Sequence, residues 1–278
     1  MLQSLAFDPE LIKKYDKLGP RYTSYPTAIQ FHEGFCVDQY QQAAERSNHD
    51  GRLLSLYVHV PFCNTACFYC ACNKIPTRDR SRSAPYLERV YQELALQSAL
   101  FDQNRLVDQL HWGGGTPTFI SHDEMKQLMD NMRKNFRLHD SDEGEYSIEI
   151  DPREADARTV KLLRQLGFNR MSLGVQDFDP SVQKAVNRIQ SKEETFEVLN
   201  AARAEGFKSV NVDLIYGLPL QNESSFLKTV DAVLEASPDR ITVFNYAHLP
   251  DMFPAQKRMN AADMPTGDTK LAMLAQTI

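Results

Sequence analysis

The part of this sequence best suited to chemistry is a group of four closely spaced cysteines. They are Cys63, Cys67, Cys70 and Cys72. The first three form a C-x3-C-x2-C run directly after the apolar segment 53–61. Three thiolates on so short a loop can reach one metal centre, because the thiolate is the metal-binding form of cysteine. The run therefore predicts a metal centre at the end of a strand.

Three kinds of site could use these cysteines. An iron–sulfur cluster fits the spacing best, since three cysteines leave one iron free to take another ligand. A structural zinc site is the alternative, but it usually takes two close pairs separated by a longer stretch. A disulfide framework fits least, because the chain has 5 cysteines in 278 residues and its first residues lack the apolar core of a secretory signal.

Composition indicates a globular, acidic chain. Hydrophobic residues make up 42% of it, and its formal net charge is -6. This apolar content supports a sizeable core, whereas the charge argues against a general nucleic-acid binder, which needs a basic face. No apolar run approaches the length of a membrane span. We expect a monomer in the reducing cytoplasm, where thiols stay free to bind iron.

Short β-branched and apolar runs, each followed by a helical pattern, must position the cysteines. Six such runs occur, at 53–60, 107–112, 146–150, 170–175, 209–216 and 240–246. Regular alternation predicts right-handed crossovers and a parallel sheet that curves into a barrel. Six units fall short of the eight in a closed barrel. The expected fold class is α/β, an open partial (β/α)6 TIM-like barrel with ligands at the C-terminal strand ends.

The segments between these runs carry the signals of crossover helices. Two capping boxes, each a serine with a glutamate three residues later, begin at Ser121 and Ser191. Gly167 and Gly206 each precede a phenylalanine between a helix and the next strand, where glycine permits the left-handed conformation that ends a helix. One predicted apolar helix face consists of Met125, Leu128, Met129 and Met132.

A run of three glycines, within HWGGGTPT at 111–118, follows the second strand. Glycines lack a Cβ, so the backbone at 113–115 can approach a ligand directly. A flexible turn is the simpler interpretation, but a single glycine would be enough for it. We therefore expect this loop to contact a ligand.

Polar residues also gather where the later strands end. The set is Glu149, Asp151, Gln176, Asp177, Asp213, Asn245 and His248, with Ala247 among them. Strand alternation turns Glu149 and Asp151 to the same face. Each residue alone could be solvated or capping, but together at a barrel mouth they indicate a ligand site. Arg188, judged by residue type alone, is expected to be a surface cation or an ion-pair partner.

Four features outside this pattern have simpler interpretations. GPRYTSYPTA at 19–28 is turn-rich, so it is either an ordered arm lying on the barrel or a loose leader. Core packing is the expected role of Cys36 and His59. Residues 266–278 begin a helix that no cap residue closes, which suggests a truncated end. The basic residues after the cysteines form either a solvated loop or a docking site for an acidic electron donor; they are Lys74, Arg78, Arg80 and Arg82.

Taken together, the cysteine run, the glycine loop and the strand count resemble the radical S-adenosylmethionine (SAM) superfamily over residues 50–278. Within it, the chain is similar to the oxygen-independent coproporphyrinogen III oxidase (coproporphyrinogen dehydrogenase) family. The matching segments are GPRYTSYPT, CNTACFYCACNK, HWGGGTPT, IEIDPRE, GVQDF, NVDLIYGLP and VFNYAHLP. A related heme chaperone typically lacks the fourth cysteine and the Tyr-Thr-Ser-Tyr segment, so Cys72 and residues 19–28 favour the oxidase.

The resemblance implies a set of cofactor-binding residues. Cys63, Cys67 and Cys70 would bind three irons of a [4Fe-4S] cluster and leave the fourth iron for SAM, so that Cys72 is not expected to be a ligand. The first SAM would contact Tyr57, Tyr69, Gly114 and Glu149. A second SAM would contact Gly115, Thr116, Gln176, Arg188, Asp213 and Ala247. No side chain is assigned a catalytic role beyond these, because the cofactor carries the chemistry.

The resemblance also implies the reaction and the partners. SAM-dependent radical chemistry would convert two propionate side chains of coproporphyrinogen III to vinyl groups, giving protoporphyrinogen IX in heme biosynthesis. Electrons would come from a flavodoxin-like or ferredoxin-like protein. Residues 1–50 would form an arm and leader and residues 51–278 the barrel, without the C-terminal helical domain of the family. The alternatives are a heme chaperone on the same scaffold and a zinc-stabilised interaction module.

Overall fold

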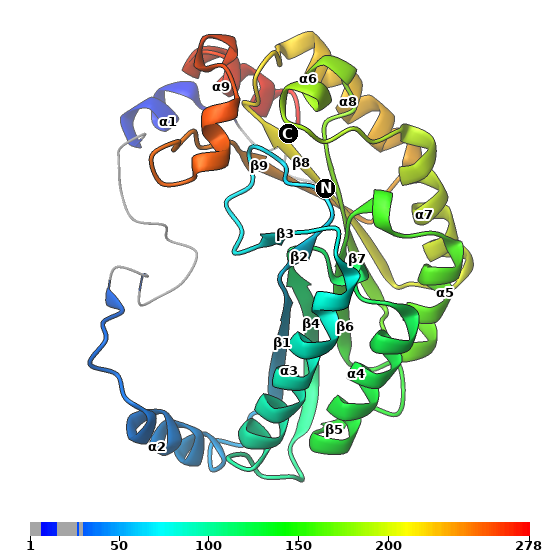
Figure 1. Ribbon diagram of the computed structural model, residues 1–278. Coiled ribbons are helices and arrows are strands. Elements are labelled where there is room, and N and C mark those ends of the chain that lie inside the picture. Colours follow the sequence, from blue (N-terminus) through cyan, green and yellow to red (C-terminus); the bar gives the residue numbers. More distant parts are fainter. Residues whose placement is uncertain (1–6, 16–26, 28–29) are drawn as a thin grey trace, which may run out of the picture.

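The computed structural model describes residues 7–15, 27 and 30–278, and a curved parallel sheet forms its centre (Figure 1). Neighbouring strands along its main path are all parallel. In order, the path is β1 (Leu54–Val60), β4 (Leu106–Gly114), β6 (Glu145–Ile150), β7 (Arg170–Gln176), β8 (Ser209–Tyr216) and β9 (Arg240–Asn245). In the described part of the chain, β1 and β9 do not pair with each other. The predicted open six-unit barrel is confirmed.

Helices cover the convex face of this sheet (Figure 1). They are α3 (Ser83–Ser98), α4 (His122–Asn135), α5 (Ala157–Leu166), α7 (Lys192–Ala204) and α8 (Glu223–Ala236). Both predicted capping boxes are confirmed, at the start of α4 and of α7. Gly167 and Gly206 have φ of 106° and 77°, so the predicted left-handed helix ends are confirmed as well.

The remaining elements are short or peripheral. The other helices are α1 (Pro9–Tyr15), α2 (Val37–Ser47), α6 (Pro180–Ala185) and α9 (Gly267–Ala275). The other strands are β2 (Phe62–Cys63), β3 (Ile75–Pro76) and β5 (Arg137–Leu138). β5 pairs with β4, and β2 pairs with β3 to form a separate small sheet. This small sheet joins the two ends of the cysteine loop. None of the helices in the described ranges is long and apolar enough to span a membrane.

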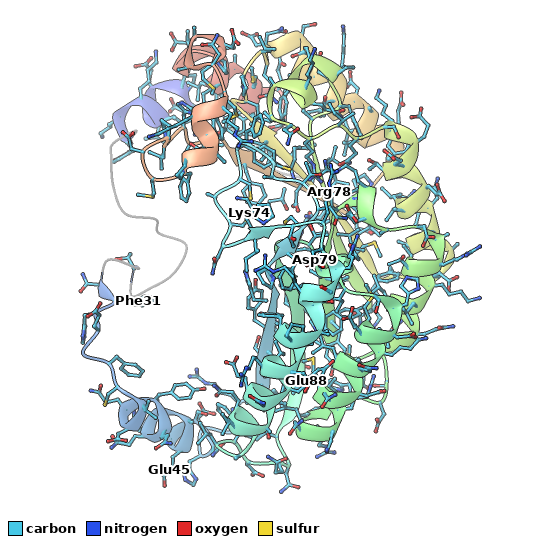
Figure 2. The ribbon with its side chains drawn as sticks, in the orientation of Figure 1. Phe31, Glu45, Lys74, Arg78, Asp79 and Glu88 are labelled. Atoms are coloured by element: carbon cyan, nitrogen blue, oxygen red, sulfur yellow. The ribbon has the colours of Figure 1, made fainter. Side chains whose placement is uncertain are left out.

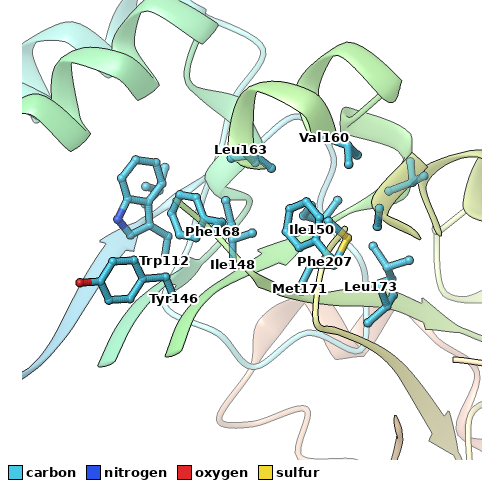
Figure 3. Close-up of a cluster of buried hydrophobic side chains, with 14 of the residues drawn as sticks. Trp112, Tyr146, Ile148, Ile150, Val160, Leu163, Phe168, Met171, Leu173 and Phe207 are labelled. Atoms are coloured by element: carbon cyan, nitrogen blue, oxygen red, sulfur yellow. The ribbon is translucent and has the colours of Figure 1, made fainter. Parts of the chain in front are cut away.

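The main hydrophobic core lies between the convex face of the sheet and its helices (Figure 3). Alternate residues of β4 and β6, among them Trp112 and Ile148, are fully buried because strand side chains alternate between faces. The ring of Trp112 packs edge-on against Phe168, with centroids 4.9 Å apart. The predicted apolar face of α4, from Met125 to Met132, is buried in the same core.

The other residues of the same strands are mostly polar and face the concave side. In β6 these are Glu145, Ser147 and Glu149, while Tyr146, Ile148 and Ile150 are buried. Parallel sheets in α/β proteins are usually apolar on both faces. The polar concave face is therefore where the fold departs from the usual pattern, and it is where cavities occur.

The expectations for residues 19–28, Cys36 and His59 have different outcomes. The predicted arm at 19–28 lies outside the described residues except for Thr27. The prediction that Cys36 packs in the core is wrong, because Cys36 is exposed and lies at the start of α2, where its backbone N–H donates to Gln39 Oε1 over 2.8 Å. His59 is partly buried, and its ring bonds the Tyr57 hydroxyl and the backbone oxygen of Asn73.

Candidate active site

A cavity of about 410 Å³ lies at the C-terminal ends of the barrel strands. The cysteine loop, the glycine loop and the ends of β6 to β9 line it. The sequence-predicted site residues among its lining are Cys63, Cys67, Tyr69, Cys70, Gly114, Gly115, Thr116, Glu149, Gln176, Arg188, Asp213 and Ala247. Residues spread over almost two hundred positions of sequence are thus brought to one cavity.

The cysteines occupy different environments within the loop. Cys63 and Cys67 are buried, Cys70 is half-buried and Cys72 is exposed. The hydroxyl of Thr116 donates to Cys63 Sγ over 3.6 Å. The Lys74 ammonium donates to the backbone oxygen of Cys70 over 2.8 Å and so fixes the turn after the third cysteine. These contacts hold the loop against the ends of the strands.

Two arginines, buried Arg188 and partly buried Arg153, converge on Cys67. Arg153 Nη2 lies 3.7 Å and Arg188 Nη1 3.6 Å from Cys67 Sγ. Asp151 pairs with both guanidinium groups, at 2.7 Å and 2.9 Å. Burial by itself raises the pKa of the Asp151 carboxyl, but the charges and hydrogen bonds of Arg188 and Arg153 lower it to about 2. Two cations against one carboxylate leave a positive surplus beside the thiol, which suits thiolates bound to a metal centre.

The thiol pKa values differ within the loop. Burial raises the pKa of Cys63 to about 11, although the Thr116 hydrogen bond opposes the shift. A hydrogen bond with Cys72 lowers the pKa of Cys70 to about 5 and, together with burial, raises the pKa of Cys72. The two neighbouring thiols thus shift each other's pKa in opposite directions.

The cysteine arrangement distinguishes the two metal hypotheses. In the described ranges, no group of three or more His, Cys, Asp or Glu side chains is placed to hold a single metal ion. Ligands of three different irons in a cluster are spaced more widely than ligands of one ion. Three thiols facing one cavity beside a surplus of positive charge fit an iron–sulfur cluster.

The glycine loop has a structural reason that its sequence did not reveal. A Cβ on Gly115 would lie 2.6 Å from the backbone oxygen of Pro61, and one on Gly114, whose φ is 120°, would lie 2.9 Å from that of Val60. The N–H groups of Gly115 and Thr116 donate to the oxygens of Val60 and Phe62, both over 2.8 Å. The glycines are thus needed where the loop packs on the backbone that leads into the cysteines. Gly114 and Gly115 also line the cavity.

Glu149 connects the glycine loop with the concave face. Its Oε2 accepts from the backbone N–H of Gly114 over 3.1 Å, and its Oε1 lies 3.4 Å from His111 Nε2. Tyr57 stacks on the ring of His111 with centroids 5.7 Å apart, but its side chain is exposed and does not line the cavity. The structure thus places Tyr57 at the rim, apart from the other predicted residues.

The end of β7 carries a strained residue and a buried carboxylate. Gln176 has φ of 69°, in the left-handed region that non-glycine residues rarely adopt. Its Oε1 is buried and has no hydrogen-bond partner among the residues that the structure describes. The next residue, Asp177, points away from the cavity and accepts from Thr229 Oγ1 over 2.8 Å and from Gln221. Strain and an unpartnered acceptor at Gln176 fit a ligand-binding role.

Asp213 lies on the next strand in a polar network. Ser172 Oγ donates to its Oδ2 over 2.6 Å, and Asn211 Nδ2 donates to its Oδ1 over 2.7 Å. Burial raises the pKa of the Asp213 carboxyl, although these hydrogen bonds oppose the shift. The carboxylate is fixed in orientation and faces the cavity, so it can accept hydrogen bonds from ribose hydroxyls.

Other expectations need correction. Of the two roles expected for Arg188, the ion-pair partner is confirmed by its contact with Asp151 at 2.9 Å. The surface cation is wrong, since Arg188 is 6% exposed and its Nη2 donates to the backbone oxygen of Gly174. Asp177 and His248 do not line the cavity, whereas Asp151 and Asn245 do. Arg80 pairs with Glu154 at 2.9 Å and lies over the ring of Phe119. Figure 2 shows Lys74 and Arg78 near the middle of the molecule, well away from Glu45 of α2 at its lower end.

Sequence reasoning missed several lining residues. Arg153 was passed over, although it directly follows the Asp151-Pro152 pair at the end of β6 and could have been found as the partner of that carboxylate. Ser172 follows the alternation of β7 and could have been predicted from it. The apolar and aromatic wall of the cavity had no pattern to reveal it; it consists of Ile215, Phe244, Tyr246, Leu249 and Phe253.

Comparison with known proteins places this geometry in a family. A family model described as the radical SAM superfamily matches residues 57–233. The chain is 55% identical over 277 residues to the oxygen-independent coproporphyrinogen III oxidase of Pseudomonas aeruginosa and 48% identical to that of Escherichia coli, covering 100% of the chain and 60% of each relative. The solved coproporphyrinogen III oxidase of E. coli, described as a radical SAM enzyme, matches with a TM-score of 0.92 and 47% identity over 99% of this chain and 61% of that one. The chain thus spans about 60% of the length of these relatives.

Proposed function

This chain belongs to the radical SAM superfamily, and from that premise we propose that it converts propionate side chains of coproporphyrinogen III to vinyl groups, giving protoporphyrinogen IX. The observation that carries the proposal is the meeting of three thiols, two arginines and strand-end polar groups at one cavity. The names of the similar oxidases support the substrate. Nothing comparable favours a heme chaperone or a zinc module.

We propose that Cys63, Cys67 and Cys70 hold a [4Fe-4S] cluster and that the residues around the same cavity bind SAM, including a second SAM molecule. When bound, these groups supply the one-electron chemistry that removes a hydrogen atom from an unactivated C–H bond. The chain's own residues bind and orient. Arg153 and Arg188 stabilise the thiolate charge at Cys67, as their distances of 3.7 Å and 3.6 Å indicate.

The remaining predicted residues would position the SAM molecules. Glu149 presents a carboxylate to the cavity while its other contacts fix it against Gly114 and His111. Gln176 offers a buried oxygen that has no donor among the described residues, and Asp213 offers an oriented carboxylate. Arg188 already pairs with Asp151, and its buried Nε has no acceptor in that same part of the chain. The apolar wall at Phe244 to Phe253 would exclude water from the reacting groups. The full assignment consists of Tyr57, Tyr69, Gly114, Gly115, Thr116, Glu149, Gln176, Arg188, Asp213 and Ala247.

The biological setting is part of the same proposal. We propose a cytoplasmic monomer that takes electrons from a flavodoxin-like or ferredoxin-like protein. Exposed Arg78 and Arg82, on the segment that follows the cysteines, are the candidate contacts for such an acidic partner. We also propose residues 51–278 as the barrel unit, with residues 1–50 as a separate arm.

The experiment is anaerobic turnover. The chain is reconstituted with iron and sulfide, given SAM, a low-potential reductant and coproporphyrinogen III, and its products are oxidised and separated by chromatography. We expect protoporphyrin, and we expect Cys67→Ser to abolish it. Cys36→Ser is the matched control, since Cys36 is exposed and outside the cavity. A parallel assay uses the chain fused to the remaining length of the P. aeruginosa relative. A reconstituted protein that cleaves SAM but leaves coproporphyrinogen unchanged in both assays would contradict the proposal.

A further inference from the structure

A second cavity of about 280 Å³ lies lower on the concave face, toward the N-terminal ends of the strands. Its lining is almost entirely polar and includes Ser55, Gln109, Glu145, Arg170, Ser209 and Arg240. Ser172 lines both this lower cavity and the upper one. The two cavities are therefore neighbours along the same strands, one with an aromatic wall and the other without.

Hydrogen-bond donors outnumber acceptors in the lower cavity. The Nε of Arg170 is buried and has no acceptor within residues 7–15, 27 and 30–278. Arg240 donates only its Nε, over 3.3 Å, to the neutral side chain of Asn211, so its terminal nitrogens have no partner in the described part of the chain. A guanidinium group is donor-only, and its preferred partner is a carboxylate that accepts two hydrogen bonds. The cavity thus has unused sites for an anion.

The negative charge within the lower cavity is already paired. Of the described residues that line it, Glu145 is the one carboxylate. Its Oε1 accepts from Arg170 over 2.7 Å, and its Oε2 accepts from Gln109 over 3.3 Å. His111, another lining group, bonds Ser147 over 2.6 Å and approaches Glu149 at 3.4 Å. One paired carboxylate therefore faces two arginines, which leaves a positive surplus.

The positions of the two arginines suit a single carboxylate. Arg170 pairs in register with Ser209, and Arg240 pairs with Asn211, so the arginines lie on the two strands that flank β8. Strands two apart are separated by about 10 Å, which two arginine side chains can span from either side. Between them Ser209 contributes only a small side chain. The space above it is open to a ligand from the cavity.

We propose that the lower cavity is a carboxylate-binding subsite in which Arg170 and Arg240 hold a carboxylate arm of the substrate that does not react. This inference rests on the proposed function, because it takes the substrate to be a tetrapyrrole with several propionates. One propionate lies in the upper cavity for the reaction while another is held below it. The lower subsite thus sets which edge of the ring faces the thiol-lined cavity.

The test is binding of oxidised coproporphyrin III, a fluorescent tetracarboxylate, to the chain without cofactors. We expect Arg170→Gln and Arg240→Gln each to weaken binding about tenfold, because each removes a charge-assisted contact. Arg158→Gln is the matched control, since Arg158 is an exposed arginine on α5, which covers the convex face. The tetramethyl ester of coproporphyrin, which lacks carboxylates, should bind all variants alike.

A fourth variant separates a binding role from a structural one. Glu145→Gln removes the carboxylate that competes for Arg170, so it should tighten coproporphyrin binding several-fold, an effect that loss of structure cannot produce. The proposal is overturned if both arginine variants bind coproporphyrin as tightly as the unmodified chain, or if Glu145→Gln weakens binding.

Binding of glutarate, a small dicarboxylate, tests the carboxylate subsite independently of the proposed function. If millimolar glutarate raises the melting temperature of the unmodified chain and not of the arginine variants, the carboxylate subsite stands, even where coproporphyrin itself fails to bind. That combination would count against the proposed tetrapyrrole substrate. If glutarate shifts all variants equally, the subsite is overturned and the proposed function is untouched.

Discussion

The two faces of the barrel sheet are built from the same strands but do different work. On the convex face the buried residues are apolar and pack under the helices, as Ile148 and Trp112 do. On the concave face the alternate residues, such as Ser147 and Glu149, are polar and line or approach cavities. Burial of apolar area stabilises the fold, whereas the polar groups of the concave face are available for contacts with ligands. We expect stability and binding to separate along each strand.

The largest expected effect on stability is at Asp151, which lines the upper cavity and also pairs with Arg188 and Arg153. Asp151→Leu removes the carboxylate that pairs with buried Arg188 and Arg153, so two cations lose their partner. Breaking such a buried pair costs about 3–5 kcal/mol, which urea unfolding of the chain would measure. Asp151→Asn, which keeps the hydrogen bonds in part, should cost less. Equal stability of Asp151→Leu and the unmodified chain would show that the arginines do not depend on Asp151.

The next prediction compares adjacent residues on the two faces of β6. Ile148→Ala should destabilise the chain by about 2–5 kcal/mol, because it leaves a cavity in the core. Ser147→Ala, one position away, removes the hydrogen bond to His111 and the longer one to the backbone oxygen of Leu110, and should cost about 1 kcal/mol. Urea midpoints of the two variants test this. Similar losses for both would mean that the concave face contributes to stability as much as the convex one.

A smaller effect is expected from a concave-face carboxylate in the upper cavity. Glu149→Gln keeps the size of the side chain but removes its charge, so a charge-assisted acceptor for SAM is lost. We expect about tenfold weaker SAM binding to the reconstituted chain by equilibrium dialysis, with little change in stability. Glu143→Gln is the control, since its side chain is 80% exposed and it does not line the cavity. Unchanged SAM affinity of Glu149→Gln would remove Glu149 from the site.

The smallest effect concerns a helix that covers the convex face. Ser191→Ala removes the capping hydrogen bond to the N–H of Glu194, 3.1 Å long, and should cost about 1 kcal/mol. Because the cap is remote from both cavities, SAM and coproporphyrin binding should stay unchanged. Urea unfolding together with the two binding assays checks both statements. A loss of binding without a larger loss of stability would contradict the separation of the faces.

The convex face could be read from the sequence because its rules are local. Period-two apolar patterns placed all six strands within two residues of their observed bounds, and the serine caps placed the starts of α4 and α7. A cap or a left-handed glycine needs only its neighbours in the chain to be recognised. The strands and helix caps of the convex face were therefore largely predictable from the sequence.

The concave face was harder to predict because its contacts are distant in sequence. Residue type alone left Arg188 as a surface cation or an ion-pair partner, and only the barrel brings Asp151 and Gly174 near enough to hold it in the interior. The sequence predicted ligand contact for the glycine loop but not the close approach of Gly114 and Gly115 to the backbone at 60–62. Cys36 offered no local signal for its exposure. The lower cavity depends on a register between strands that no single segment encodes.

The most direct test of the proposed cluster site is Mössbauer spectroscopy of the chain reconstituted with iron-57, before and after SAM is added. If three cysteines hold the cluster, one of its four irons differs from the other three and changes its signal when SAM binds. The spectra of Cys72→Ser should be the same. Four equivalent irons that do not respond to SAM, or loss of an iron in Cys72→Ser, would contradict the claim that Cys63, Cys67 and Cys70 alone hold the cluster.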